Sequence, residues 1–301
     1  MPALPAPGAG MSAYARPASL DDALELLGED GAAPLAGGTD LAGQVDRGIR
    51  TPALLVDLRD AGLGTVEERD GGLRIGATVT LAALAASPLV APYAAVIKAA
   101  SLAASPLIRN VGTVGGNVCQ HTRCWYYRGE EWHCWLGGGD TCYAQIGDHR
   151  KHNLEPGDCI SAHPSDLAPA LAACGATVAI RSASGARELS LLDLYRRPTE
   201  DNRSLLDLGP GELLVSVSLP GPPDASAYER LGERAAFSFP LVSVAAARRG
   251  DDFRLVAAGV ANVPRALDPT DPASGLPGNP QTGWKRQALQ TLAERALAAV
   301  A

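Results

Sequence analysis

The chain has 301 residues, of which 46% are hydrophobic, and it carries a formal net charge of −7. This length suggests two or three domains, and the apolar content suffices for a packed core, which excludes global disorder. A nucleic-acid partner is not expected, because neutralising phosphates requires an excess of basic residues. No apolar run approaches the roughly 20 residues that span a bilayer, so no membrane segment is expected.

Residues 1–10 are rich in Pro, Ala and Gly, which predicts a disordered lead-in. They lack the charged start and long apolar centre of a signal peptide, so we expect a cytoplasmic protein. Export alongside a partner that carries its own leader is the alternative. In a reducing compartment, clustered cysteines are better interpreted as metal ligands than as disulfides.

A small β–α–β unit is predicted first. Residues 19–27 have the pattern of an amphipathic helix, with Ser19 at its N-cap. A short apolar piece at 33–36 then breaks into a glycine turn. A helix over 41–49 and a buried strand over 53–57 complete the unit.

A second unit begins near Gly72, with a strand over 73–76 and helices over 80–86 and 92–104. Apolar residues in 117–163 recur with neither the spacing of a helix nor the alternation of a strand. A loop of this length needs something that holds it in place, and a metal cluster would do so.

Regular structure resumes with a helix over 166–174, followed by strands over 177–181 and 212–219. The sequence Gly-Pro-Pro-Asp at 221–224 marks a boundary, because two prolines cannot continue a sheet. Beyond it we predict strands over 227–234, 241–248 and 253–260, and a final helix over 282–301.

Two glycine turns carry chemical information, one over 35–41 (Leu-Ala-Gly-Gly-Thr-Asp-Leu) and one over 112–117 (Gly-Thr-Val-Gly-Gly-Asn). Glycine lets the backbone approach a ligand closely, and consecutive N–H groups bind phosphate oxygens without a lysine. Either motif alone is also typical of an ordinary tight turn. Together, on two α/β units, they indicate a cofactor diphosphate held between them. Neither matches the P-loop or the Gly-x-Gly-x-x-Gly fingerprint.

Four cysteines fall in the segment without a period: Cys124, Cys134, Cys142 and Cys159. Four thiolates suit a tetrahedral zinc ion or a 4Fe–4S cluster. The Cys-x2-Cys pairs of zinc ribbons do not occur, so the open spacing favours the cluster over zinc, and coincidence is the remaining alternative. Cys174 lies on an apolar helix and is typical of a small core residue.

The other polar residues of this region have two interpretations. Its histidines are either metal ligands or loop hydrogen-bonding groups. Cys119 lies beside the second glycine turn, and its role is ambiguous from the sequence. Asp166 begins a helix and needs no function there, but beside a flavin its carboxylate would accept from ribityl or ribose hydroxyls. No hydrolytic triad or His-Glu-x-x-His motif occurs, which is compatible with electron transfer, where the cofactor does the chemistry.

These motifs together resemble the FAD-binding medium subunit of molybdenum hydroxylases, the family of xanthine dehydrogenase, carbon monoxide dehydrogenase and 4-hydroxybenzoyl-CoA reductase. The resemblance covers about residues 11–301. The segments that carry it are 34–41, 108–117, 165–167, 211–217 and 237–244. Residues 122–126 (Thr-Arg-Cys-Trp-Tyr) are similar to the subtype with an added 4Fe–4S cluster, as in bacterial aldehyde oxidoreductase.

The resemblance implies an α+β fold. Two α/β FAD-binding subdomains of the PCMH type would cover 11–65 and 66–222, with the iron–sulfur loop at 117–163. A C-terminal domain over 223–301 would contain a three-stranded antiparallel sheet and helices.

The resemblance also implies roles for single residues. Asp166 would bind ribityl or ribose hydroxyls, and Leu214 would pack near the flavin. Some members place a lysine near the flavin where this chain has Glu229, and Arg230 or Arg234 is the candidate substitute. The residues implied to hold the FAD diphosphate are Leu35, Ala36, Gly37, Gly38, Thr39, Asp40, Leu41, Thr113, Gly115, Gly116 and Asn117. The implied 4Fe–4S ligands are Cys124, Cys134, Cys142 and Cys159.

The implied function is electron transfer within a complex. Electrons would leave a molybdenum cofactor in a large partner, cross 2Fe–2S clusters in a small partner, reach the FAD of this chain and leave to a small-molecule acceptor. Two alternatives stay open: a self-sufficient FAD oxidase, and a zinc-stapled nucleotide-binding scaffold. A visible spectrum distinguishes these possibilities in part: a zinc-stapled scaffold would be colourless, whereas the electron-transfer subunit and the oxidase would both show flavin bands.

Overall fold

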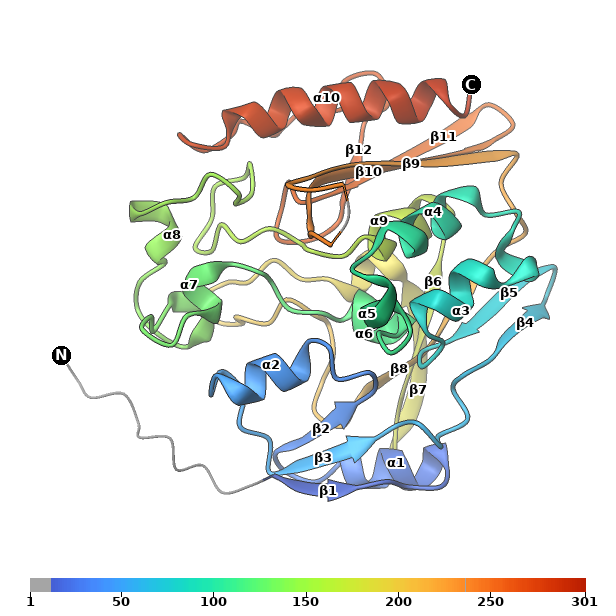
Figure 1. The fold of residues 1–301 in the computed structure, drawn as a ribbon, viewed down its shortest axis with the longest axis vertical. Coiled ribbons are helices and arrows are strands. Elements are labelled where there is room, and N and C mark those ends of the chain that lie inside the picture. Colours follow the sequence, from blue (N-terminus) through green and yellow to red (C-terminus); the bar gives the residue numbers. More distant parts are fainter. Residues whose placement is uncertain (1–11, 236) are drawn as a thin grey trace.

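Three separate β-sheets and the helices between them make up the fold (Figure 1). The computed structural model describes residues 12–235 and 237–301. The predicted disordered lead-in, 1–10, lies outside the described residues. No helix in the described part of the chain combines the length and apolar character needed to cross a bilayer.

The first sheet has three parallel strands in the order β1-β3-β2. Helix α1 begins at the predicted N-cap, where Ser19 Oγ accepts a hydrogen bond from the Asp22 N–H at 3.1 Å. The predicted β–α–β unit is present as β2, α2 and β3, although α2 ends three residues earlier than expected. The elements are β1 (Ala13–Ala15), α1 (Leu20–Leu27), β2 (Ala32–Leu35), α2 (Leu41–Asp46) and β3 (Leu54–Asp57).

The second sheet has five antiparallel strands in the order β4-β5-β8-β6-β7. Strand β8 enters between β5 and β6 although it follows them by many residues, so this sheet depends on long-range pairing. The strands are β4 (Val66–Arg69), β5 (Gly72–Gly76), β6 (Thr177–Ser182), β7 (Gly185–Ser190) and β8 (Leu213–Leu219).

The third sheet has four antiparallel strands in the order β12-β11-β10-β9. Three of them were expected, and β12 adds a short edge strand. Helix α10 packs on this sheet through Leu289, Leu292 and Ala296. The elements are β9 (Ala225–Gly232), β10 (Pro240–Arg249), β11 (Asp252–Ala258), β12 (Arg265–Leu267) and α10 (Gly283–Ala298).

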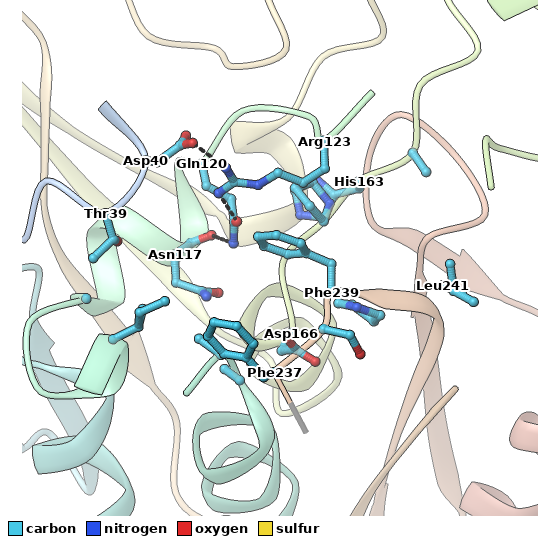
Figure 2. Close-up of a pocket in the computed structure, with 18 of the residues that line it drawn as sticks. Thr39, Asp40, Asn117, Gln120, Arg123, His163, Asp166, Phe237, Phe239 and Leu241 are labelled. Carbon is cyan, nitrogen blue, oxygen red and sulfur yellow. Dashed lines mark hydrogen bonds and ion pairs between the residues drawn. The ribbon is translucent and has the colours of Figure 1, made fainter. Parts of the chain in front are cut away.

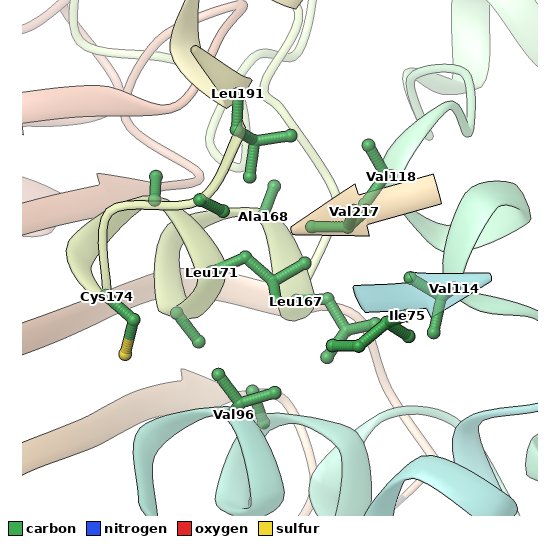
Figure 3. Close-up of a cluster of buried hydrophobic side chains, with 14 of the residues drawn as sticks. Ile75, Val96, Val114, Val118, Leu167, Ala168, Leu171, Cys174, Leu191 and Val217 are labelled. Carbon is green, nitrogen blue, oxygen red and sulfur yellow. The ribbon is translucent and has the colours of Figure 1, made fainter. Parts of the chain in front are cut away.

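Helices α4 and α9 lie between the second and third sheets and form the centre of the largest core (Figures 1 and 3). Every residue of α9 is buried, as expected for a helix that is apolar all round. Leu171 of α9 belongs to the same buried hydrophobic cluster as Ile75 of the second sheet and Val256 of the third. The helices of this part of the chain are α3 (Leu81–Ala86), α4 (Ala94–Leu102), α5 (Pro106–Arg109), α6 (Val114–Val118) and α9 (Leu167–Ala173).

The segment from 119 to 163 is mostly irregular, as its lack of period predicted. It contains only the short helices α7 (Trp125–Arg128) and α8 (Tyr143–Ile146) and a 3₁₀ turn at Trp135–Gly137. It also has a small apolar cluster of its own, which includes Tyr126, Cys134 and Ile160. Two further 3₁₀ turns occupy Pro88–Val90 and Leu191–Leu194.

Replacing Leu171 with alanine tests the position of α9. Because Leu171 is fully buried, we expect the L171A variant to lose about 2–5 kcal/mol of unfolding free energy in a urea titration. Leu107 is 80% exposed, so L107A should change that free energy by no more than about 0.5 kcal/mol. Equal effects of the two substitutions would contradict the packing of α9 in the core.

Candidate functional site

The two glycine turns predicted to hold a diphosphate touch each other in the folded chain. A Cβ atom built on Gly37 would lie 1.8 Å from the carbonyl oxygen of Val111, a separation that no side chain tolerates. Gly38 has a φ of +69°, a conformation that favours glycine. Glycine at these positions is therefore required for the first turn to meet the segment that leads into the second.

The second turn is fixed by its own side chains. Thr113 Oγ1 accepts from the Gly116 N–H at 3.1 Å and caps α6. Asn117 Oδ1 accepts from Ser165 Oγ at 2.6 Å and from the Leu167 N–H at 3.3 Å. The second turn is therefore joined to the start of α9, where Asp166 lies.

Two cavities open along the glycine turns. The first has a volume of about 440 Å³ and the second about 470 Å³, each within the range of small-molecule sites. The residues that border both are Thr39, Asp40, Thr113, Gly116 and Gln120. The two cavities therefore form one elongated site with the turns at its middle.

The first cavity lies between the second turn and the β9–β10 hairpin (Figure 2). Phe237 and Phe239 project into it from the hairpin, and Asp166 lies at its base. The Arg123 guanidinium is 4.4 Å from the centre of the Phe239 ring, a cation–π distance. His163, which is almost fully buried, also lines this cavity.

The second cavity has a more aliphatic wall and lies beside β8. Leu206, Leu208 and Leu214 line it, together with Ala36 to Leu41 of the first turn. Leu214 and Asp166 therefore lie in different cavities. Two of the other predicted site residues, Leu35 and Arg230, line neither cavity.

Asp40 is the electrostatic centre of the shared wall. Its Oδ1 is 2.7 Å from Arg123 and 2.8 Å from Arg128, and its Oδ2 accepts from the His121 N–H at 2.9 Å. Burial alone would raise the pKa of Asp40, but the two arginine charges and these hydrogen bonds outweigh it and lower that pKa. The carboxylate is therefore fully charged and fully compensated at neutral pH.

Asp166 has the opposite environment. Burial raises its pKa to about 6, although the Arg230 charge and the Tyr228 hydroxyl both act to lower it. Tyr228 donates to Asp166 Oδ1 at 2.6 Å, and Arg230 Nε lies 3.3 Å from the same oxygen. Arg230 also donates to the carbonyls of Leu102 and Ser238, so it supports Asp166 from behind the cavity wall.

The four predicted cysteine ligands border one further, very small cavity of about 10 Å³. All four are free thiols. Burial raises the pKa of Cys124 to about 12, whereas a hydrogen bond from Cys159 lowers the pKa of Cys142 to about 6. Among the described residues, no three His, Cys, Asp or Glu side chains are close enough to hold a single metal ion.

Cys124 lines both this small cavity and the first large one. Its sulfur is 3.2 Å from Nε2 of His152, and burial lowers the pKa of that histidine to about 4, so its ring is neutral. The cysteine site and the first cavity are thus direct neighbours.

Sequence reasoning missed several residues of the site. Arg123 lies in the Thr-Arg-Cys-Trp-Tyr motif, which was assigned only to the cysteine site. Phe237 and Phe239 lie in a segment that contributed to the family resemblance, without a stated role. Gln120 carried no local signal, because only the fold brings it to the cavity, whereas His163 was among the histidines weighed as metal ligands or hydrogen-bonding groups.

A comparison with known families decides the class of protein. The family model described as "FAD binding domain in molybdopterin dehydrogenase" matches residues 10–222. The chain belongs to this family. Two expectations are therefore confirmed: the family itself and FAD as a cofactor of this chain. Membership also favours FAD over the alternative of a zinc-stapled scaffold.

Individual members of the family agree. The aldehyde oxidoreductase FAD-binding subunit PaoB of Escherichia coli K12 is 38% identical over 249 residues, which cover 80% of this chain and 78% of PaoB. The carbon monoxide dehydrogenase medium chain of Afipia carboxidovorans is 32% identical over 226 residues, covering 72% and 62%. A solved structure, reconstituted CO dehydrogenase from Oligotropha carboxidovorans, matches with a TM-score of 0.71 at 26% identity over 97% of this chain and 98% of that one. The expected α+β fold is confirmed.

Adding one methyl group at the contact between the turns should remove FAD. In the G37A variant the new Cβ collides with the Val111 carbonyl and forces the turns apart, so we expect most of the bound flavin to be lost. The flavin-to-protein absorbance ratio after desalting measures this loss. Gly43, on α2, has open space around its Cβ position, so G43A is the matched control and should keep its flavin. A G37A protein with full flavin would show that the close contact is not needed.

The raised pKa of Asp166 predicts a pH dependence of stability. Its folded-state pKa of about 6 exceeds the ordinary value of 3.8, so the folded state binds this proton more tightly. The resulting stabilisation is present below pH 4 and is lost as the pH rises to 6, up to about 3 kcal/mol.

The D166N variant should lack this decline when the unfolding free energy of the FAD-free full chain is measured between pH 4 and 7. The exposed Asp201 provides the control, and D201N should follow the wild type. Parallel pH profiles of D166N and wild type would contradict the assignment.

Proposed function

We propose that this chain is the FAD-carrying medium subunit of a molybdenum-dependent dehydrogenase. In this function, electrons pass from a molybdenum cofactor in a large partner to 2Fe–2S clusters in a small partner. They then reach the FAD of this chain, which passes them to an external small-molecule acceptor. The observation that carries the proposal is the contact between the two glycine turns, with a cavity on each side, in a member of this family. The names of its relatives, "FAD-binding subunit" and "medium chain", support it.

In this proposal the FAD lies extended across both cavities. Its diphosphate rests on the turns at 35–41 and 113–117. The first turn would supply the backbone donors, because the N–H groups of Gly115, Gly116 and Asn117 already donate to acceptors within the protein. The chain has no lysine on these turns. The compensated Asp40 fits this role, because Arg123 and Arg128 cancel the repulsion that a bare carboxylate would exert on a diphosphate.

We assign the isoalloxazine to the first cavity and the adenine to the second. The first cavity contains the aromatic rings of Phe237 and Phe239 and borders Cys124, which brings the redox-active ring next to the cysteine site. The aliphatic second cavity suits adenine. With this orientation Leu214 contacts the adenine rather than the flavin, which revises its expected role, and Asp166 faces the ribityl side.

We further propose that Cys124, Cys134, Cys142 and Cys159 ligate a 4Fe–4S cluster. The donor set fits: these free thiols border one cavity and are surrounded by the aromatic residues Tyr126, Tyr143 and Trp135. Four thiolates are the ligand set of a cubane cluster, and all four line the same small cavity. When bound, FAD supplies exchange of one or two electrons and the cluster supplies single-electron transfer.

The chain's own residues would then hold and shield these groups. Phe237 and Phe239 would cover part of the first cavity with their rings, and the Asp166 carboxyl is about half protonated at pH 6. The domain boundaries at residues 65 and 222 and a reducing, cytoplasmic location, which suits free clustered cysteines, are part of the same proposal.

Anaerobic purification followed by metal analysis tests the proposal. We expect one FAD and about four iron atoms with matching acid-labile sulfide per chain, and a broad brown absorbance beneath the flavin bands. Replacing any one of the four cysteines with serine should remove most of the iron and leave FAD bound. Cys174 lies in the core, outside this site, so C174A is the control and should keep its iron.

Other outcomes would overturn parts of the proposal. A wild-type protein that contains no iron, or that contains zinc instead, would rule out the 4Fe–4S cluster. Full turnover of aldehydes or purines by the isolated chain would replace the subunit role with that of a self-sufficient oxidase.

A further inference from the structure

One histidine stands between the first cavity and the cysteine site. His152 lines the first cavity, and its Nε2 lies 3.2 Å from the sulfur of Cys124, a residue that borders both spaces. The other histidines with ring hydrogen bonds have different partners: His121 contacts the Tyr127 hydroxyl, and His149 contacts a backbone carbonyl and a backbone N–H. The contact with sulfur is therefore particular to His152.

The backbone of His152 is held from the C-terminal helix. Lys285, fully buried on α10, donates from Nζ to the carbonyl oxygens of Lys151 at 3.0 Å, His152 at 2.8 Å and Gly259 at 2.6 Å. The His152 N–H donates to the His149 carbonyl at 2.9 Å. These bonds join the cysteine loop to the third sheet at the position of His152.

The imidazole ring is also fixed by packing. It meets the Trp125 ring edge-on, with centroids 4.8 Å apart, and only 3% of His152 is exposed. Its Nδ1 has no hydrogen-bond partner, so the contact with sulfur is the one polar interaction of the ring in the described structure. A thiolate can only accept a hydrogen bond, so the ring nitrogen that faces it must carry the proton.

Resting on the function proposed above, we propose that His152 is a positioning residue that donates a hydrogen bond from Nε2 to the Cys124 thiolate and thereby raises the reduction potential of the 4Fe–4S cluster. One-electron reduction adds negative charge to the cluster, and part of that charge resides on the thiolate sulfurs. A donor at one sulfur stabilises the reduced form more than the oxidised form. The bond acts on the ligand nearest the flavin cavity, so it bears on the electron exchange between cluster and FAD.

Three variants of the full chain, purified anaerobically, test the proposal by EPR-monitored redox titration. His152→Phe keeps a ring against Trp125 but removes the donor. His152→Gln keeps an N–H donor at similar reach. His133 is exposed and makes no hydrogen bond through its ring in the described structure, so His133→Phe is the matched control.

We expect H152F to lower the equilibrium constant for cluster reduction about tenfold, which is about 59 mV for a one-electron couple. H152Q should recover most of this shift, and H133F should match the wild type. An unchanged potential in H152F with full iron would overturn the proposal. So would equal shifts in H152F and H152Q, because packing rather than hydrogen bonding would then be responsible.

If H152F binds no iron, pulsed EPR of the wild-type chain labelled with 15N-histidine decides. Coupling of the reduced cluster to an imidazole nitrogen supports the bond, and no such coupling overturns it. An iron-free wild type is a different result, because it removes the cluster itself and not only the role of His152.

Discussion

The site depends on one steric constraint, the contact between Gly37 and the Val111 carbonyl. Any side chain at Gly37 would separate the first sheet's turn from the segment that enters α6. Because the two turns meet, Thr39 and Gly116 border the same two cavities. A long two-ended ligand can then bind with its middle on backbone groups and its ends on side chains of different units. The division of the site into two unlike cavities follows from this contact.

The cysteine loop is held more firmly by protein contacts than its sequence suggested. A loop of this length was expected to need a metal cluster to fix it. In the folded chain Asp40 pairs with Arg128, Glu155 pairs with Arg197, and Lys285 binds three carbonyls around the loop. These contacts come from all parts of the chain and bring Cys124 next to the first cavity. The loop can therefore present its thiols without relying on metal alone for its path.

The sequence predicted what is encoded locally. Glycine turns, caps and the longer helices have signals within a few residues, and these elements lie near their predicted positions. The short strands β1, β4 and β12 were missed, because three or four residues have no measurable period and depend on pairing with distant strands. The separation of Leu214 from Asp166 was missed for a similar reason: β8 inserts into the middle of the second sheet, whereas Asp166 begins α9 beneath the third.

Two carboxylates of the site show how an acidic chain can accept an anionic cofactor. Asp40 is charged but forms ion pairs with Arg123 and Arg128, so it presents little net negative potential to a diphosphate. Burial raises the pKa of Asp166 to about 6, so its carboxyl is still mostly ionised at pH 7 and takes up its proton only as the pH falls to about 6. Near pH 7 both carboxylates are charged, and each lies beside at least one arginine. Two arginines suit Asp40, which must also join the first turn to the cysteine loop. Asp166 faces the cavity with only Tyr228 and Arg230 behind it, so its charge is offset less completely.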